Sequence, residues 1–188
     1  FTGTISISSG RITCPLDGSR PVYGLDEMNG FVEKLKAYDV IWLGGGHVPT
    51  QNAFFHQMQL REKIQTFAGI VIGISAGTMN CADEVYVQPE LPGEAVNPDF
   101  IRYIQGLGLT QTKIIPHYQM VKDWYLDGMR LYEEITYSDS WGKTFLVLTD
   151  GSYLFCEDGK EMIYGEAYVI NNGKILQICS TDRCCRWR

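Results

Sequence analysis

A strand-like run that ends in a tight turn constrains this chain more than any other feature. Residues 69–74 read Gly-Ile-Val-Ile-Gly-Ile, and Ser75-Ala76-Gly77 follows directly. The apolar run predicts a strand, the small residues after it can begin a helix, and Gly-x-Ser-x-Gly at the junction is typical of a nucleophile elbow. Such a turn lifts the serine hydroxyl out of the sheet and aims backbone N–H groups at the group it attacks. The same residues also suit an ordinary strand-to-helix turn.

Length, composition and charge narrow the class of protein. The chain has 188 residues, of which 45% are hydrophobic, which predicts a single domain over residues 1–188. The net charge is −6, whereas a nucleic-acid-binding protein needs a basic face. No apolar run approaches the roughly 20 residues of a membrane span, and the first residues do not resemble a signal peptide. We expect a cytoplasmic protein that binds neither nucleic acid nor membrane.

The cysteines do not predict a metal site. Their spacing is irregular, no Cys-x-x-Cys pair occurs, and only three histidines are present. Structural zinc needs closely spaced ligand pairs, so we expect no metal and no cofactor. A chain of this length does not need a disulfide framework, and reduced thiols are expected. The six cysteines are Cys14, Cys81, Cys156, Cys179, Cys184 and Cys185.

The first half of the chain predicts a strand–helix–strand unit. Residues 38–43 form an apolar run that ends in three glycines, and Pro49 suits the first turn of a helix. Apolar residues recur at helical spacing over residues 49–67, and the strand at 69–74 follows. Such a unit is typical of a parallel sheet with helices on its faces.

The second half predicts two more buried strands and then an antiparallel region. Residues 113–118 and 145–148 read as strands, and residues 123–135 as an amphipathic helix that begins at Asp123. Strands at 152–156, 162–170 and 174–178 follow, with a hairpin turn at residues 171–173. The predicted fold is α/β, a mostly parallel sheet flanked by helices, with a C-terminal antiparallel β-meander.

Three polar residues at predicted strand ends can form a catalytic triad. A serine nucleophile needs a base, and the base needs an acid that orients it. His117 is the only histidine after Ser75, and both His117 and Asp150 follow predicted strands. The carboxyl ends of parallel strands meet at one edge of the sheet, where ligands bind. Taken singly, His117 also suits a core histidine and Asp150 a turn residue.

The glycines after residue 43 are candidates for an oxyanion hole. Backbone N–H groups of Gly45 and Gly46 can lie beside that of Ala76, because glycine lets the backbone approach closely. Gly44 and His47 are candidates for substrate contact. A Gly-rich turn or a phosphate loop is the alternative, but the spacing matches neither nucleotide-binding motif.

Four motifs, in this order, resemble the serine peptidase family of aspartyl dipeptidase (peptidase E) and cyanophycinase. The resemblance covers roughly residues 38–170 and implies a class I glutamine amidotransferase-like fold with serine in place of the usual cysteine. It implies Ser75 as nucleophile, His117 as the histidine of the Pro-His motif and Asp150 as the triad acid. The matching segments are Leu43–His47, Gly73–Gly77, Ile115–Tyr118 and Thr149–Ser152.

The chain departs from that family in two places. The family has an additional strand–helix–strand section before the Gly-rich strand, whereas here residues 29–37 lead almost directly into Tyr38. Either the section is truly absent from the protein or it is missing from this sequence. The family's dipeptidases select an N-terminal aspartate with a cationic pocket, and neither Lys122 nor Arg130 aligns clearly with that role. Aspartyl specificity is therefore not carried over.

The leading hypothesis is a serine hydrolase of small peptides that acts through an acyl-enzyme, and a homodimer is left open. An α/β-hydrolase-type esterase is one alternative, but its acid must precede the histidine. A non-catalytic amidotransferase-like binding module is the other. The esterase's acid would be one of Asp83, Glu84, Glu90, Glu94 and Asp99.

Overall fold

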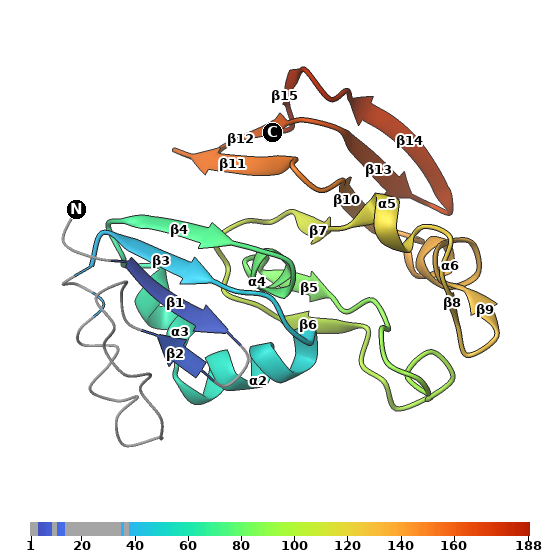
Figure 1. Cartoon of the computed structure of the whole chain (residues 1–188), viewed down its shortest axis with the longest axis horizontal. Coiled ribbons are helices and arrows are strands. Elements are labelled where there is room, and N and C mark those ends of the chain that lie inside the picture. The colour runs from blue at the N-terminus through green and yellow to red at the C-terminus, as the bar shows by residue number, and fades with distance from the viewer. Residues whose placement is uncertain (1–3, 9–10, 14–34, 36–37) are drawn as a thin grey trace. The chain divides into compact units, whose positions relative to one another are not determined.

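The computed structural model describes residues 4–8, 11–13, 35 and 38–188, and it divides into two compact units (Figure 1). Unit 1 contains residues 1–85 and 105–111, and unit 2 contains residues 86–104 and 112–188. Each unit has a hydrophobic core of its own. The single domain expected from length stays a prediction. The departure expected at residues 29–37 lies almost wholly outside the described residues.

Unit 1 is built on a four-stranded sheet in the order β2-β1-β3-β4. β1, β3 and β4 are parallel, and β2 is antiparallel to β1. The strands predicted at 38–43 and 69–74 are confirmed as β3 and β4, and their parallel pairing is confirmed with them. The bounds are β1 (Thr4–Ser8), β2 (Arg11–Thr13), β3 (Val40–Leu43) and β4 (Ile70–Gly73).

The helix predicted over residues 49–67 is wrong as a single element. It is two helices, α2 (Val48–Gln57) and α3 (Leu60–Ile64), because Gln59 between them is left-handed with φ 51°. The break lets both helices turn apolar residues toward the sheet, so that Phe55 and Ile64 pack with Ile41 of β3. A short helix, α4 (Ala76–Asn80), follows β4. Among the described residues, no helix is long and apolar enough to span a bilayer.

Unit 2 contains a four-stranded mixed sheet in the order β14-β13-β10-β7. β7 and β10 are parallel, as predicted, and the pairs β10–β13 and β13–β14 are antiparallel. With antiparallel pairs this frequent among the described strands, the fold is a mixed α/β fold. The bounds are β7 (Lys113–Ile115), β10 (Thr144–Leu148), β13 (Ala167–Asn171) and β14 (Lys174–Cys179).

The C-terminal strands are antiparallel, as predicted, but their bounds differ from the predicted ones. The single strand expected over residues 162–170 is two strands, because Gly165 turns the chain with φ 92°. A second antiparallel sheet, in the order β11-β12-β15, therefore stands beside the first in unit 2. Its strands are β11 (Tyr153–Glu157), β12 (Lys160–Tyr164) and β15 (Cys184–Arg186).

The helix predicted over residues 123–135 is wrong. Asp127 and Gly128 both have positive φ, 52° and 84°, and form a two-residue hairpin turn. The chain forms α5 (Tyr118–Val121), the short strands β8 (Tyr125–Leu126) and β9 (Met129–Arg130), a π-helix η2 (Leu131–Thr136) and α6 (Tyr137–Asp139). β5 (Glu84–Tyr86) and β6 (Tyr103–Gln105) pair where the chain passes between the units.

One disulfide corrects the expectation of reduced thiols. The Sγ atoms of Cys179 and Cys185 are bonded, with 6.0 Å between the two Cα atoms. Cys179 ends β14 and Cys185 lies in β15, so the bond joins two strands through residues that are six positions apart in sequence. Of the other described cysteines, Cys81, Cys156 and Cys184 are thiols.

Candidate active site

The residues around Ser75 form the sharp turn that the sequence predicts. Ser75 follows β4 and has φ 54° and ψ −121°, a conformation that L-residues with side chains rarely adopt. Gly73 and Gly77, on either side of Ser75, must be glycine because neighbouring backbone atoms leave no room for a side chain. A Cβ on Gly73 would lie 2.8 Å from the Cα of Thr78, and a Cβ on Gly77 would lie 2.1 Å from the carbonyl oxygen of Leu43. The turn therefore depends on glycine at both ends.

The glycine loop lies against this serine because β3 and β4 are neighbours. Leu43 pairs with Gly73 in register, so the residues after both strands emerge at one edge of the sheet. The backbone N–H of Gly77 donates to the carbonyl of Gly44 at 3.0 Å. A Cβ built on Gly45 would lie 3.4 Å from the Cβ of Ser75 and 3.7 Å from its Oγ. Gly45 is therefore in van der Waals reach of the candidate nucleophile.

The remaining residues predicted around the serine lie in the same unit. Gly46 has φ 145°, a value that favours glycine, and Ala76 is buried. His47 stands at the N-terminal end of α2, and its Nδ1 lies 2.8 Å from the Oγ1 of Thr50. His56 is exposed on α2.

His117 and Asp150 are hydrogen-bonded to each other in unit 2. The His117 Nδ1 to Asp150 Oδ1 distance is 2.6 Å, and the side chains are 37% and 46% exposed. Ile115 of β7 pairs with Val147 of β10, so both residues follow neighbouring parallel strands. The side-chain oxygen of Gln119 accepts the backbone N–H of Asp150 at 3.0 Å. With Nδ1 bonded to the carboxylate, Nε2 is the nitrogen left for exchange of a proton with a substrate.

Backbone strain gathers at the candidate residues. Three of the described non-glycine residues with positive φ, Asp127, Asp158 and Asn172, each precede a glycine in a hairpin turn. Gln59 separates α2 from α3. The others are Ser75 and His117, whose φ is 62° directly after Pro116. Positive φ at non-glycine residues outside hairpin turns, as at Ser75 and His117, is typical of functional sites.

A polar cavity of about 280 Å³ lies beside Asp150. The carboxylate of Glu166 at its wall accepts the hydroxyl of Tyr168, and this bond raises the pKa of Tyr168 to about 12. Sequence reasoning missed Gln119, although its place two residues after His117 is a usable signal. The cavity is lined by Gln119, Thr149, Asp150, Gly151, Ser152, Gly165, Glu166 and Thr181.

The cations that the sequence singled out have acidic or phenolic neighbours. Arg130 donates from Nε to the hydroxyl of Tyr125 at 3.0 Å, and Lys122 lies 4.0 Å from a carboxylate oxygen of Asp123. In the described part of the chain, no three histidine, cysteine or acidic side chains are grouped so that they could hold a metal ion.

Comparison with known proteins decides the family. The sequence model of peptidase family S51 matches residues 22–163. The chain belongs to peptidase family S51. Serine peptidase family membership, expected from the four motifs, is thereby confirmed.

A solved structure with a similar chain comes from Listeria monocytogenes EGD-e and is named as a candidate peptidase E protein. It is 17% identical, with a TM-score of 0.45, and the match covers 84% of this S51 chain and 66% of that chain. This chain therefore spans slightly less than two thirds of the length of that protein. No curated protein sequence matches the chain.

Proposed function

We propose that this S51 chain is a serine hydrolase that cleaves small peptides through Ser75, His117 and Asp150. The observation that carries the proposal is the 2.6 Å hydrogen bond between His117 Nδ1 and Asp150 Oδ1. An orienting carboxylate on Nδ1 is what a histidine base needs, because it fixes the ring and stabilises the imidazolium that forms. The His117 side chain is 37% exposed, which argues against a core histidine.

The proposed reaction has two stages. Ser75 Oγ attacks the substrate carbonyl while His117 Nε2 takes the hydroxyl proton, and the same nitrogen then gives that proton to the leaving amine. Water then gives a proton to His117 and attacks the acyl-enzyme; the bond between the acyl carbon and Ser75 Oγ breaks, the carboxylic acid leaves, and His117 returns the proton to Ser75 Oγ. Asp150 stays ionised throughout and holds the imidazole.

The negative charge of the tetrahedral intermediate would be held by backbone groups beside Ser75. Support comes from the close approach of Gly45 to Ser75 and from Ala76, whose N–H follows the serine in the turn. We assign the oxyanion hole to the N–H groups of Gly45, Gly46 and Ala76. Each such donor is worth on the order of 10²–10³ in rate. Gly44 and His47 then adjoin the bound substrate.

We also propose that the chain has a class I glutamine amidotransferase-like fold. In that fold, one mostly parallel sheet would contain both the β3–β4 pair and the β7–β10 pair. The esterase alternative requires an acid that precedes the histidine, and the His117 ring is bonded to Asp150, which follows it. We therefore keep the peptidase hypothesis, with aspartyl specificity left out of it.

A reactive-serine probe tests the proposal. An alkyl fluorophosphonate should form a P–O bond to Ser75 Oγ with loss of fluoride, and peptide mass spectrometry should find the adduct on residue 75. A library of dipeptides and N-blocked peptides should then be cleaved by the wild type and not by Ser75→Ala. A folded wild type that is neither labelled nor active would contradict the proposal and favour the non-catalytic binding module.

A cytoplasmic location is also part of the proposal, and the Cys179–Cys185 disulfide makes it testable. Such bonds are rare where glutathione keeps thiols reduced. Alkylation of the protein in a freshly quenched cell lysate, followed by mass spectrometry, would show whether the two thiols are free. Full alkylation supports the cytoplasm, and a fully protected pair would argue for an oxidising compartment.

A further inference from the structure

Three buried amide side chains in unit 1 form a hydrogen-bonded chain that ends at the glycine loop. Gln51 and Asn80 are 0% exposed and Asn52 is 6% exposed. Gln51 Nε2 donates to the carbonyl of Gly44 at 2.7 Å, and Asn80 Nδ2 donates to Gln51 Oε1 at 3.1 Å. Asn52 Nδ2 donates to Asn80 Oδ1 at 2.9 Å and to the carbonyl of Gln105 at 2.8 Å. We call Gln51, Asn52 and Asn80 the amide relay.

The direction of every bond in the amide relay follows from its two ends. The carbonyls of Gly44 and Gln105 can only accept, so the NH₂ groups of Gln51 and Asn52 must face them. The oxygen of Gln51 must then face Asn80, which donates to it, and the oxygen of Asn80 must face Asn52. Each amide has a single orientation that satisfies both of its neighbours, so the relay has one hydrogen-bonded state.

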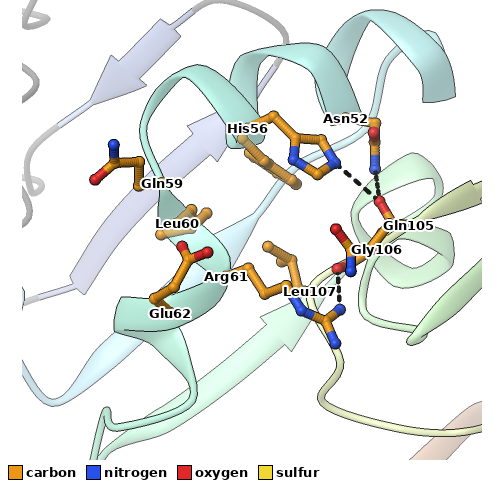
Figure 2. Close-up of a pocket in the computed structure, with 10 residues that line it drawn as sticks. Asn52, His56, Gln59, Leu60, Arg61, Glu62, Gln105, Gly106 and Leu107 are labelled. Carbon is orange, nitrogen blue, oxygen red and sulfur yellow. Dashed lines mark hydrogen bonds between the residues drawn. The ribbon is translucent and has the colours of Figure 1, made fainter.

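The far end of the amide relay is anchored by a second side chain. Figure 2 shows Asn52 and His56 directed at the carbonyl oxygen of Gln105. The His56 Nε2 to oxygen distance is 3.1 Å. This carbonyl lies at the wall of a cavity of only about 50 Å³, near Arg61, which donates to the carbonyl of Gly106. The relay therefore ends on a backbone segment that is itself held in place.

The near end of the amide relay meets the candidate oxyanion hole. The Gly44 carbonyl accepts two donors, the amide of Gln51 and the backbone N–H of Gly77. Gly77 lies two residues after Ser75, and Gly45 follows Gly44 directly and packs against Ser75. The Gly44 carbonyl and the Gly45 N–H belong to one planar peptide unit, so holding the carbonyl also fixes the direction of this N–H beside the serine.

We infer that Gln51 is a positioning residue for the oxyanion hole, and that Asn80 and Asn52 act through it. The inference rests on the proposed function, because it gives the glycine loop a catalytic role. Loss of one amide leaves its buried neighbours without a partner and therefore costs stability, whether or not the relay has a catalytic role. The observation that favours a positioning role is that the network has one satisfied orientation and thereby fixes a geometry.

The first test is Gln51→Met, which keeps the length of the side chain and removes both of its hydrogen bonds. The rate constant for labelling by an alkyl fluorophosphonate should fall about 10–100-fold, because a small displacement of positioned donors costs about that much. KM for a cleaved peptide should change little while kcat falls. Gln57→Met, at an exposed position of the same helix, is the matched control and should label at the wild-type rate.

The second test, Gln51→Glu, separates positioning from stability. A neutral glutamic acid donates to Gly44 and accepts from Asn80 as the amide does, whereas its ionised form sets a carboxylate against the Gly44 carbonyl. The ratio of the variant's labelling rate constant to that of the wild type should be near one at low pH and fall at least 10-fold as pH rises. The ratio cancels every pH dependence that the variant and the wild type share.

The outcomes distinguish the inference from the proposed function. Labelling rate constants of Gln51→Met equal to the wild type, or a Gln51→Glu ratio that stays flat with pH, would overturn the role of the amide relay and leave the serine mechanism standing. A wild type that is not labelled at Ser75 overturns both. A change confined to the melting temperature and the labelled fraction, with unchanged rate constants, would also overturn the inference, because it shows a structural role only.

Discussion

The candidate catalytic groups of this S51 peptidase-family chain lie at two sheet edges, each formed by the carboxyl ends of two neighbouring parallel strands. The two edges present different kinds of group and hold them in different ways. At the β3–β4 edge, in unit 1, the candidate groups are backbone N–H groups and one serine, held by glycines and buried amides. At the β7–β10 edge, in unit 2, they are two side chains, His117 and Asp150, and both are more than a third exposed. In each case neighbouring parallel strands bring together residues that are far apart in sequence.

The difference between the two edges indicates where the fold tolerates amino-acid substitutions. The turn at Ser75 has no room for added atoms, since a Cβ on Gly77 would lie 2.1 Å from a backbone oxygen. The His117–Asp150 pair has solvent on one side, so a substitution there removes a function and disturbs little packing. Substitutions of the glycines at the first edge should therefore affect folding and activity together, whereas substitutions of His117 and Asp150 at the second edge should affect activity alone.

The largest effect is expected from Ser75→Ala and His117→Ala, one from each edge. If the triad acts as a unit, each should lower kcat/KM on the order of 10⁴-fold or more, and the double variant should lose no more than the worse single one. Peptide cleavage by the purified variants measures this. Activity that survives in purified Ser75→Ala would rule out acyl transfer through this serine, and additive losses would show two independent functions.

A smaller loss of activity is expected from Asp150→Asn. The amide keeps the shape of the carboxylate but favours the wrong tautomer of the histidine, so we expect kcat to fall by up to about 10⁴-fold, less than in Ser75→Ala. The melting temperature should stay within a few degrees of the wild type, because the side chain is 46% exposed. Thermal unfolding by circular dichroism is the accompanying measurement. A variant that unfolds at room temperature would refute the distinction between the two edges.

At the first edge, Gly77→Ala should destabilise unit 1. The added methyl group meets the backbone oxygens of Leu43 and Gly44, which cannot move without breaking the end of β3, so we expect a cost of roughly 3 kcal/mol or more. Gly142→Ala is the matched control. Gly142 has φ 70° with open space around it, so only the backbone term, about 1 kcal/mol, applies. Equal losses in urea unfolding would contradict the close approach at Ser75.

The smallest effect is expected from Gln119→Ala at the second edge. The variant loses the acceptor for the backbone N–H of Asp150, an exposed bond worth less than about 1 kcal/mol. Activity should fall only a few-fold, with kcat affected more than KM because the acid is less well oriented. Gln119→Glu keeps an acceptor and should restore most of the activity. A loss as large as that of Asp150→Asn would mean that Gln119 has a more direct role.

The pattern of apolar residues, together with the rule that neighbouring parallel strands end at the same edge of a sheet, predicts much of both edges. Apolar runs predict β3, β4, β7 and β10, and the expectation that parallel strands end together predicts that His117 and Asp150 meet although they are 33 positions apart in sequence. The Asn172-Gly173 turn is equally visible in sequence, because both positions need positive φ. These features depend on local preferences and on one rule of sheet topology.

The features that the sequence does not predict depend on single residues whose backbone conformation or hydrogen bonds differ from what the hydrophobic periodicity around them indicates. Asp127-Gly128 forms a hairpin inside a stretch with helical spacing, and Gln59 adopts a left-handed conformation that divides one predicted helix into two. Gln51 and Asn80 count as polar in any periodic pattern, yet they are fully buried, because each has its partners inside the fold. Such partners become visible only once the helices are packed.

The central claim is that the two edges act on one substrate, and a crystal structure of the chain after reaction with an alkyl fluorophosphonate tests it most directly. The account predicts phosphorus bonded to Ser75 Oγ, a phosphoryl oxygen within hydrogen-bond distance of the Gly45 and Ala76 N–H groups, and His117 Nε2 at roughly 2.6–3.2 Å from Ser75 Oγ. An adduct on Ser75 with His117 well beyond hydrogen-bond reach, and another base in its place, would contradict it.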